Sequence, residues 1–161
     1  MLPDTRRRAE LVGVEGKGVE MTTQQRFPFG DEHVQVYRET GGKEGHSWKE
    51  GSTVLLLTTT GRTSGLPRTV PLIYAKDGNR HVIVASKGGA PKHPGWYRNL
   101  VKTPEVELQV GPDVFKARAT TAEGAERERL WRKANEIWPH YDQYATRTDR
   151  LIPVVVLEPI R

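Results

Sequence analysis

The sequence predicts an α+β protein that is mainly β, built as a small closed or partly closed barrel of antiparallel strands with helical insertions. Three observations predict this class. Apolar, β-branched runs of strand length recur along the chain, for example in Ser52–Thr60 and Arg80–Ser86. Turn residues join neighbouring runs, most clearly at Asp77 and Gly78, a dipeptide typical of hairpin turns. Two stretches with helical features interrupt the strands, and no repeat or linker divides the chain.

The composition favours one globular domain and excludes several kinds of site. The 161 residues suit a single modest core, and 35% of them are apolar. The chain has no cysteine, which excludes disulfides, thiolate metal sites, iron–sulfur ligation and a cysteine nucleophile. No apolar run reaches the length of a membrane span and no segment resembles a signal peptide, so the cytoplasm is the expected location.

The charge balance is basic, with a net charge of +5 and a pI of about 9.6. Such a balance favours an anionic partner (a phosphate-bearing cofactor, nucleic acid or an acidic membrane surface), although solubility alone also explains it. Residues 1–25 are polar, Gly-rich and aperiodic, and we expect a disordered leader there, with Met21 as an alternative start. Its Arg6–Arg8 cluster would suit a nucleic-acid arm, which is the less favoured interpretation. Residues 26–161 are expected to form a single domain.

The first ordered element is a short amphipathic helix within Phe27–Thr40, beginning near Asp31. A polar loop follows over Gly41–Gly51. Strands then dominate: Ser52–Thr60 is the first strand, Leu66–Lys76 the second and Arg80–Ser86 the third. A helix begins with Pro94 at its first helical position and ends before Pro104.

The last third of the chain predicts a second hairpin, two helical segments and a final strand. The hairpin strands are Glu105–Val110 and Val114–Thr120. Thr120 and Glu123 fit a capping box, which would begin a helix that runs to about Ile137. Pro139 then breaks this helix and starts another turn, which carries Tyr141 and Tyr144 on one face. The final strand is expected over Leu151–Glu158, with Pro153 near its start or at an edge.

The stretch from Val54 to Pro71 is the strongest candidate for a binding site. We interpret it as a β-hairpin whose connection holds an anion, because Gly61 and Gly65 can take positive φ and aim backbone N–H groups at one point. The side-chain donors of this connection are Thr63, Ser64, Arg62 and Arg68. An ordinary Gly-rich turn with solvated arginines is an equally good interpretation of the turn chemistry alone.

Other catalytic patterns are absent from the sequence. The five histidines are too scattered for a zinc motif, and His81, inside a strand, suits a structural role. The chain has no GxGxxG motif, no Walker loop and no G-x-S-x-G elbow. A second Gly-rich connection with a cation follows the third strand at Ser86–Gly89. Phenol donors are available at Tyr74, Tyr141 and Tyr144, although a partly buried core role explains each tyrosine singly.

Five blocks in order resemble the deazaflavin-dependent nitroreductase family. These blocks are Thr58–Arg68, Pro71–Tyr74, Ala85–Gly89, Pro94–Leu100 and Thr148–Leu157. The match covers about residues 53–159. The resemblance implies a split β-barrel related to FMN-binding flavoreductases, and it implies coenzyme F420, an 8-hydroxy-5-deazaflavin, as the cofactor.

The resemblance also implies hydride transfer from the reduced coenzyme to an electron-poor small molecule. Family acceptors include quinones, nitroaromatics and activated enones. Members come mainly from actinobacteria, and some associate with the membrane, so peripheral membrane contact is a second expectation for the location. The coenzyme carries a phosphodiester and a polyglutamate tail, which a basic face suits. Because its ring supplies the hydride, the protein needs neither a nucleophile nor a metal.

The family's functional positions fall on three groups of residues. The residues that would hold the phosphate and tail are Arg62, Thr63, Ser64, Arg68, Thr69 and Val70. The residues that would line the ring are Pro71, Leu72, Ile73, Val84, Ala85, Ser86 and Lys87, completed by Gly95, Trp96, Tyr97, Arg98 and Asn99. The residues near the ring and the acceptor are Tyr141, which would touch the coenzyme, and Tyr144. With Ser86, these two tyrosines are the catalytic candidates that hold or protonate the acceptor oxygen.

Two departures from the family pattern concern the acceptor. Trp138 stands where some relatives have another tyrosine, and Ile73 stands where an aromatic residue can occur. Both leave nitroimidazole activation open. The alternative functions are an FMN-dependent oxidoreductase on the same barrel and a non-catalytic module for an anionic ligand. Nucleic-acid binding is not expected, because no aromatic-and-basic signature motif is present. The oligomeric state does not follow from the sequence.

Overall fold

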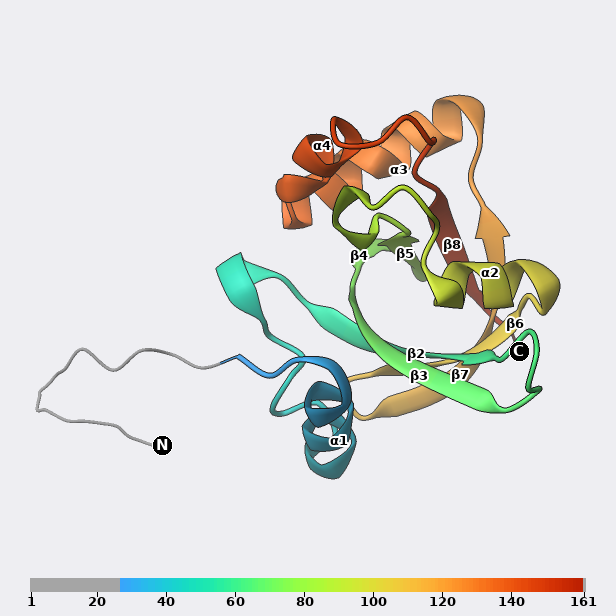
Figure 1. Ribbon diagram of the computed structural model, residues 1–161. Coiled ribbons are helices and arrows are strands. Elements are labelled where there is room, and N and C mark those ends of the chain that lie inside the picture. Colours follow the sequence, from blue (N-terminus) through green and yellow to red (C-terminus); the bar gives the residue numbers. More distant parts are fainter. Residues whose placement is uncertain (1–26, 161) are drawn as a thin grey trace, which may run out of the picture.

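The computed structural model describes residues 27–160, so the predicted leader lies outside the described residues. Within these residues, four helices accompany seven strands and two 3-10 turns, and Figure 1 shows their arrangement. The helices are α1 (Gly30–Thr40), α2 (Gly95–Lys102), α3 (Gly124–Ile137) and α4 (His140–Ala145), and the 3-10 turns are η1 (Lys49–Gly51) and η2 (Lys87–Gly89). The strands are β2 (Val54–Thr60), β3 (Pro67–Ile73), β4 (Ala75–Asp77), β5 (Arg80–Val84), β6 (Glu105–Val110), β7 (Asp113–Thr121) and β8 (Val154–Pro159).

All seven strands belong to one antiparallel sheet, in the order β3-β2-β6-β7-β8-β5-β4. The two edge strands, β3 and β4, are consecutive in the chain and are separated only by Tyr74. One extended segment therefore bends at Tyr74 and crosses from one edge of the sheet to the other, as the curved ribbon in Figure 1 shows. The sheet wraps into a split barrel, which confirms the predicted fold class.

The predicted single strand Leu66–Lys76 is wrong, because this segment forms two strands that pair with different partners. β3 pairs with β2 along its whole length, whereas β4 pairs with β5. The break has a physical cause at Tyr74, which is 7% exposed and hydrogen-bonds through its hydroxyl to His46 Nε2 at 2.8 Å. Its backbone N–H donates to the carbonyl of Thr53 at 3.0 Å, next to the start of β2.

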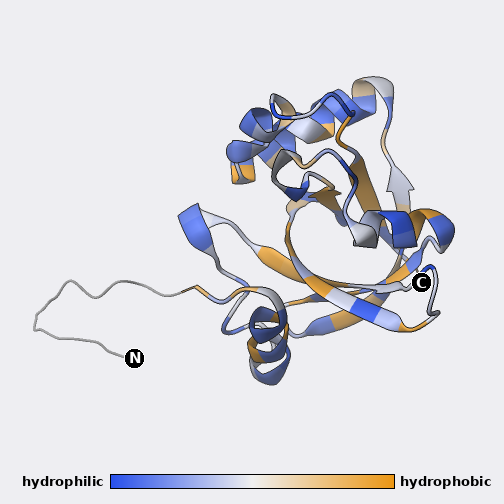
Figure 2. Ribbon diagram, viewed as in Figure 1, coloured by the Kyte–Doolittle hydropathy of each residue, from blue (hydrophilic) through white to orange (hydrophobic). Residues whose placement is uncertain are grey.

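The barrel interior holds one apolar cluster with contributions from most strands. Its members include Leu55, Leu57, Ile83, Leu108 and Leu157. Helix α2 adds Leu100 to this cluster, with Trp96 and Tyr97 packed against it, so α2 covers the interior from one side. Helix α3 instead packs Leu130 on Val82, Val154 and Val156, which belong to a second cluster. Figure 2 shows the resulting contrast between apolar strands and largely hydrophilic outer helices.

Two predicted helix starts need correction. The capping box at Thr120 is wrong: β7 continues through Thr121, which pairs with Val155, and α3 begins after Glu123 without a side-chain cap. Thr120 and Thr121 pair with Val156 and Val155 of β8, so strand pairing overrides the local capping signal. Pro94, predicted to be the first helical residue, is instead the N-cap of α2, which begins at Gly95. The break at Pro139 and the helical turn with Tyr141 and Tyr144 are confirmed.

Within residues 27–160, no helix is long and apolar enough to cross a membrane. No group of three histidine or acidic side chains in this part of the chain could hold a metal ion.

Candidate functional site

The β2–β3 turn is fastened to helix α2 by Asn99. The backbone N–H and the guanidinium Nη1 of Arg62 both donate to Asn99 Oδ1, at 3.1 and 2.9 Å. Asn99 Nδ2 donates in turn to Thr59 Oγ1 at 3.0 Å, and the Asn99 side chain is buried. Lys102 also donates to the carbonyl oxygen of Arg62 at 2.8 Å. Asn99, predicted to complete the coenzyme pocket, thus uses its side chain to position Arg62.

The two glycines of this turn act in different ways. Gly65 has φ +73°, as expected for a residue in the left-handed region. Gly61 does not have positive φ, which corrects the expectation for it. A Cβ atom at Gly61 would instead lie 2.6 Å from Ser64 Oγ and 3.1 Å from the carbonyl oxygen of Leu66. Gly61 is therefore required because Ser64 and Leu66 approach its Cα closely. The backbone N–H of Gly61 closes the turn by donating to Leu66 O at 2.8 Å.

Strand β3 divides its predicted site residues between two faces, because successive side chains of a strand alternate. Val70 and Leu72 pack against the interior cluster, as Trp96 and Tyr97 of α2 also do. Thr69 lies on the other face, where its hydroxyl accepts from Arg38 of α1 at 2.9 Å. A coenzyme contact of Thr69 would therefore come from its backbone. Arg68 is exposed on the same strand.

A second group of predicted site residues meets in one cluster over the outer face of β5. Its buried part includes Val84, Trp138 and Tyr141, and Ile73 and Tyr144 pack against the cluster. Burial raises the pKa of Tyr141, so its phenol stays protonated at neutral pH. Tyr144 is half-buried, and its hydroxyl oxygen accepts from Trp138 Nε1 at 3.3 Å. The sequence predicted both tyrosines as site residues, but it did not predict this hydrogen bond.

The connection between β5 and α2 is sharply folded. Lys87, Gly88 and Gly89 are consecutive residues with φ of +47°, +63° and +85°. Helix α4 rests on this connection, since a Cβ at Gly89 would lie 2.6 Å from the carbonyl oxygen of Tyr144. The Lys87 side chain is exposed and Ser86 is buried. The structure thus places the predicted ring-lining segment directly beside the predicted acceptor-side helix.

Arg150, which lies in the connection between α4 and β8, is not among the predicted site residues. Its guanidinium donates to three backbone carbonyls of the segment 85–90 and to Nδ1 of His93. The signal that could have found it was its place in the matched block Thr148–Leu157, to which no site role was given. The aromatic ring of His93 also contacts that of Tyr97, with centroids 5.0 Å apart, so Arg150 connects the loop to α2.

The charges of these segments suit an anionic coenzyme. Residues 61–74 and 84–103 contain no aspartate or glutamate. They contain six cations: Arg62, Arg68, Lys87, Lys92, Arg98 and Lys102. The rest of the chain is therefore close to neutral, and the excess positive charge belongs to the two segments that carry most of the predicted coenzyme contacts. Guanidinium and ammonium groups in this setting fit phosphate and carboxylate groups.

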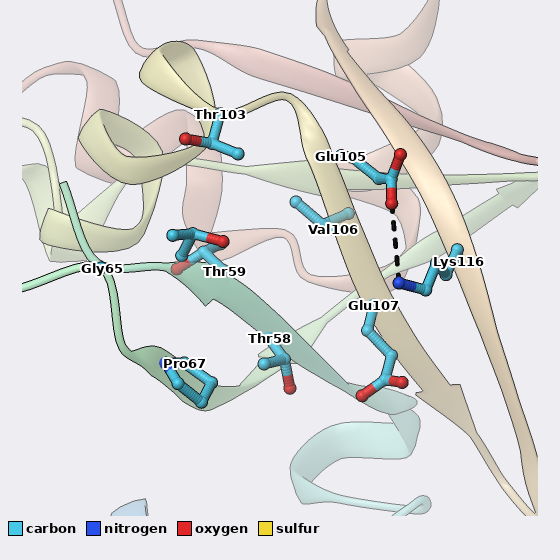
Figure 3. A pocket seen from close by; sticks show the side chains of 10 residues that line it. Thr58, Thr59, Gly65, Pro67, Thr103, Glu105, Val106, Glu107 and Lys116 are labelled. Carbon is cyan, nitrogen blue, oxygen red and sulfur yellow. Dashed lines mark ion pairs between the residues drawn. The ribbon is translucent and has the colours of Figure 1, made fainter.

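A neighbouring pocket of about 450 Å³ has a different character (Figure 3). Its lining residues are Thr58, Thr59, Thr60, Gly65, Pro67, Thr103, Glu105, Val106, Glu107 and Lys116. Lys116 forms an ion pair with Glu105 at 3.6 Å, and Glu107 adds a further carboxylate. Because two acidic side chains outnumber the single cation, this pocket does not suit a phosphate-bearing ligand. Arg62 and Arg68, the predicted phosphate contacts, are not among its lining residues.

Comparisons with known proteins agree on one family. A family model described as F420H(2)-dependent quinone reductase matches residues 30–159. An F420H(2)-dependent quinone reductase of Mycobacterium tuberculosis is 46% identical over 128 residues, covering 78% of this chain and 86% of that protein. The solved structure of an F420-H2 dependent reductase, FDR-A, is 47% identical and covers 65% of this chain and 93% of its own, with a TM-score of 0.62. A structure described as a domain-swapped dimer is 42% identical, with 79% and 95% coverage and a TM-score of 0.64.

Proposed function

The chain belongs to the F420H(2)-dependent quinone reductase family, and from this premise we propose that it transfers a hydride from reduced coenzyme F420 to a quinone-type acceptor. The membership confirms the resemblance to deazaflavin-dependent reductases and the coenzyme that it implied. The observation that carries the proposal in the structure is the pair of segments 61–74 and 84–103, which hold six cations and no acidic side chain.

Two sets of residues would hold the coenzyme. The cationic turn, with Arg62 fixed by Asn99 and Arg68 exposed on β3, would bind the phosphate and the carboxylate tail. The buried segment from Val84 to Ser86, facing the cluster of Ile73 and the α4 tyrosines, would lie against the ring. When bound, coenzyme F420 supplies the hydride. The protein's own tasks are to orient the acceptor, to exclude water and to provide a proton.

Tyr144 is the residue proposed to hold or protonate the acceptor oxygen. A quinone that accepts a hydride develops negative charge on oxygen, which a nearby hydrogen-bond donor stabilises. Because Trp138 Nε1 donates to the Tyr144 oxygen, the phenol proton of Tyr144 stays available for donation. Tyr141 is more deeply buried and is proposed to contact the coenzyme, with Ser86 as a second donor from the loop.

The identity of the acceptor, the location of the protein in the cell and its oligomeric state are further predictions. Nitroaromatics and enones are the other predicted acceptors. Trp138 and Ile73 replace residues that some relatives have at these positions, so they are the residues expected to change which of these acceptors is reduced. Location in the cytoplasm, peripheral membrane contact and assembly are likewise predictions. A relative at 42% identity forms a domain-swapped dimer, which makes the oligomeric state of this chain worth measuring.

The test compares two coenzymes and one acceptor. The purified protein is titrated with F420 and, separately, with FMN, and binding is followed by fluorescence. We expect a lower dissociation constant for F420, and we expect a simple quinone such as menadione to oxidise bound F420H2. FMN binding as tight as or tighter than F420 would favour the FMN-dependent alternative. Tight F420 binding without oxidation by any quinone, nitroaromatic or enone would favour the non-catalytic module.

A further inference from the structure

Arg150 makes an unusual set of contacts with the predicted ring-lining segment. Its Nε donates to Ala90 O at 2.8 Å, its Nη2 to Ser86 O at 2.7 Å and its Nη1 to Ala85 O at 3.2 Å. Nη1 also lies 2.9 Å from His93 Nδ1. Because a guanidinium group has only donors, His93 Nδ1 accepts and the ring proton resides on Nε2.

Among residues 27–160, the charge of Arg150 has no carboxylate partner. No acidic side chain of residues 27–160 lies within ion-pair distance of this guanidinium, and its four partners are neutral oxygen and nitrogen atoms. Burial lowers the pKa of Arg150, but arginine stays charged in proteins. The pKa of His93 is also lowered, by its own burial first and then by Arg150 and Arg98. Within the part of the chain that the structure describes, the cation is therefore paired only with neutral groups beside the loop.

The backbone that Arg150 holds is strained. Lys87 is a residue with a side chain and has φ +47°, and the two glycines after it also lie in the left-handed region. Such conformations persist only where surrounding contacts determine them, and they concentrate at ligand sites. Arg150 bonds to the carbonyls of Ala85 and Ser86 before the strained residues and to that of Ala90 after them. It thereby fixes both ends of the turn.

We propose that Arg150 is a positioning residue for the coenzyme: it holds the segment 85–90 in the shape that presents Ser86 and Lys87, and it supplies positive charge beside that segment. The proposal rests on the proposed function, since it concerns the site for F420. It assigns a role to the matched block Thr148–Leu157, which has none in the sequence analysis. A lysine would keep the charge at this position, but its single nitrogen lacks the planar fork by which Nε, Nη1 and Nη2 of Arg150 each bond a different carbonyl.

Arg127 provides a matched control. It is also a half-buried arginine, and its Nη2 donates to the backbone carbonyl of Ile152 at 2.7 Å. It therefore holds the same connection between α4 and β8, but from α3, and it also pairs with Glu128. Its side-chain hydrogen bonds and ion pair within residues 27–160 reach Glu128 and Ile152, neither of which is a predicted coenzyme-site residue. Arg127→Lys should report what the loss of a guanidinium in this region costs the fold alone.

The first experiment reads the loop without any coenzyme. Amide hydrogen exchange is measured on the full-length protein, its Arg150→Lys and Arg150→Gln variants and Arg127→Lys. We expect faster exchange within residues 85–93 in both Arg150 variants and unchanged exchange there in the control. Wild-type protection of this segment in both Arg150 variants would overturn the proposal, as would a uniform rise across the whole barrel in Arg150→Lys.

The second experiment measures the dissociation constant for F420 by fluorescence. The loss of charge-assisted hydrogen bonds that shape a site typically weakens binding about tenfold to hundredfold. We expect about a tenfold rise for Arg150→Lys, a larger rise for Arg150→Gln and less than about threefold for Arg127→Lys. Wild-type affinity in both Arg150 variants would overturn the proposal. Absent F420 binding by the wild-type protein would instead overturn the proposed function, and the exchange experiment would still decide whether Arg150 holds the loop.

Discussion

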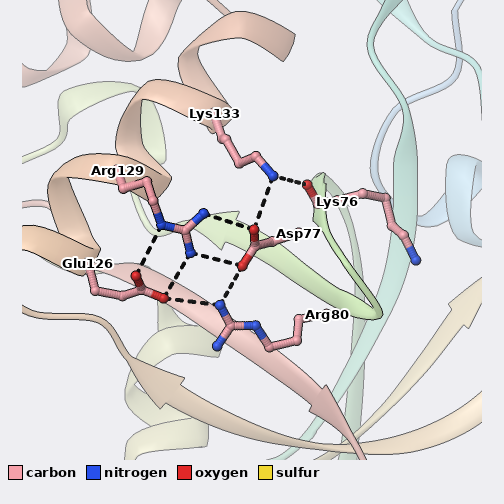
Figure 4. Close-up of polar contacts among 6 residues, drawn as sticks. All are labelled: Lys76, Asp77, Arg80, Glu126, Arg129 and Lys133. Carbon is pink, nitrogen blue, oxygen red and sulfur yellow. Dashed lines mark hydrogen bonds and ion pairs between the residues drawn. The ribbon is translucent and has the colours of Figure 1, made fainter.

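Two regions of this barrel concentrate charge, and they handle it in opposite ways. Where the β4–β5 hairpin meets α3, Asp77 and Glu126 bind Arg80, Arg129 and Lys133 in one connected network (Figure 4). Around the predicted coenzyme site, six cations occupy two segments that contain no acidic residue. The first region satisfies its charges internally and joins two elements of the fold. Within residues 27–160 the second forms no ion pair with its six cations, and we predict that they bind an anionic partner. The comparison therefore predicts which residues serve stability and which serve binding.

The network between the β4–β5 hairpin and α3, called the paired region below in contrast to the unpaired region of segments 61–74 and 84–103, is centred on Asp77. Its carboxylate accepts from Arg129 Nη1 and Lys133 Nζ at 3.0 Å each, and it also pairs with Arg80. Hydrogen bonds from Arg129, Arg80 and Lys133 hold the pKa of Asp77 far below its usual range. The Asp77 side chain is only 12% exposed, so the loss of its charge would leave several cations close together. This network should therefore act on the free energy of unfolding and not on ligand affinity.

The largest expected effect is that of Arg68→Ala on the unpaired region. Removal of one charge-assisted partner of a phosphate or carboxylate costs about 1.5–3 kcal/mol, which is roughly a tenfold to hundredfold rise in the dissociation constant for F420. Because Arg68 is exposed, the melting temperature of the apo-protein should change little. Fluorescence titration and thermal unfolding measure the two quantities. Arg132→Ala, which removes an exposed cation from α3, is the control, and a large drop in stability with unchanged affinity would assign Arg68 to the fold.

The next largest effect is that of Asp77→Asn on the paired region. This change keeps the size of the side chain but removes the charge that holds three cations, and breaking such a network should lower the free energy of unfolding by about 2 kcal/mol. The F420 dissociation constant should stay within about twofold of wild type. Chemical denaturation and the same titration test both statements. If Asp77→Asn weakens coenzyme binding as strongly as Arg68→Ala does, the two regions are not independent.

How far the fold could be predicted depended on the range of the contacts involved. The hairpins and the helical turn after Pro139 follow from neighbouring residues, and they were predicted. The division between β3 and β4 was not, because Tyr74 is fixed by partners 28 and 21 residues away, at His46 and Thr53. The failed capping box at Thr120 has the same cause, since pairing with β8 decides the end of β7.

The site shows the same limit. The Gly-rich turn with Arg62 and Arg68 has local chemistry that points to an anion, and the family motifs add the coenzyme. The use of Asn99 to position Arg62 across 37 residues could not be inferred from spacing. Arg150 contacts carbonyls 60 to 65 residues earlier in the chain, and backbone carbonyls carry no sequence signal. Residues that hold a site, unlike those that touch a ligand, therefore required the structure.

A smaller effect is expected from acid, and it should act on the fold. Burial and then the charge of Lys76 lower the pKa of His81 to about 4. Since the unfolded state binds the proton first, below its ordinary pKa of about 6.5, stability should fall progressively as the pH drops from 6.5 to 4. Asp77, with a lowered pKa, should contribute a further loss only below about pH 4. His81→Phe should flatten the first window and Asp77→Asn the second, as measured by denaturation at each pH.

The smallest effect on either stability or affinity is expected from Tyr144→Phe, which tests a third role that is neither structural nor electrostatic. The substitution keeps the ring on Tyr141 and removes only the hydroxyl that Trp138 Nε1 contacts at 3.3 Å. The F420 dissociation constant should change by less than about threefold, under about 0.7 kcal/mol. Single-turnover oxidation of bound F420H2 by a quinone should nevertheless slow by at least about tenfold, because a positioned proton donor contributes that much or more. Tyr141→Phe is the comparison, and it should weaken both coenzyme binding and turnover. A wild-type rate in Tyr144→Phe would show that Tyr144 is not the proton donor and would leave Ser86 or a bound water as the candidate. The predicted difference between the paired and unpaired regions does not depend on this result.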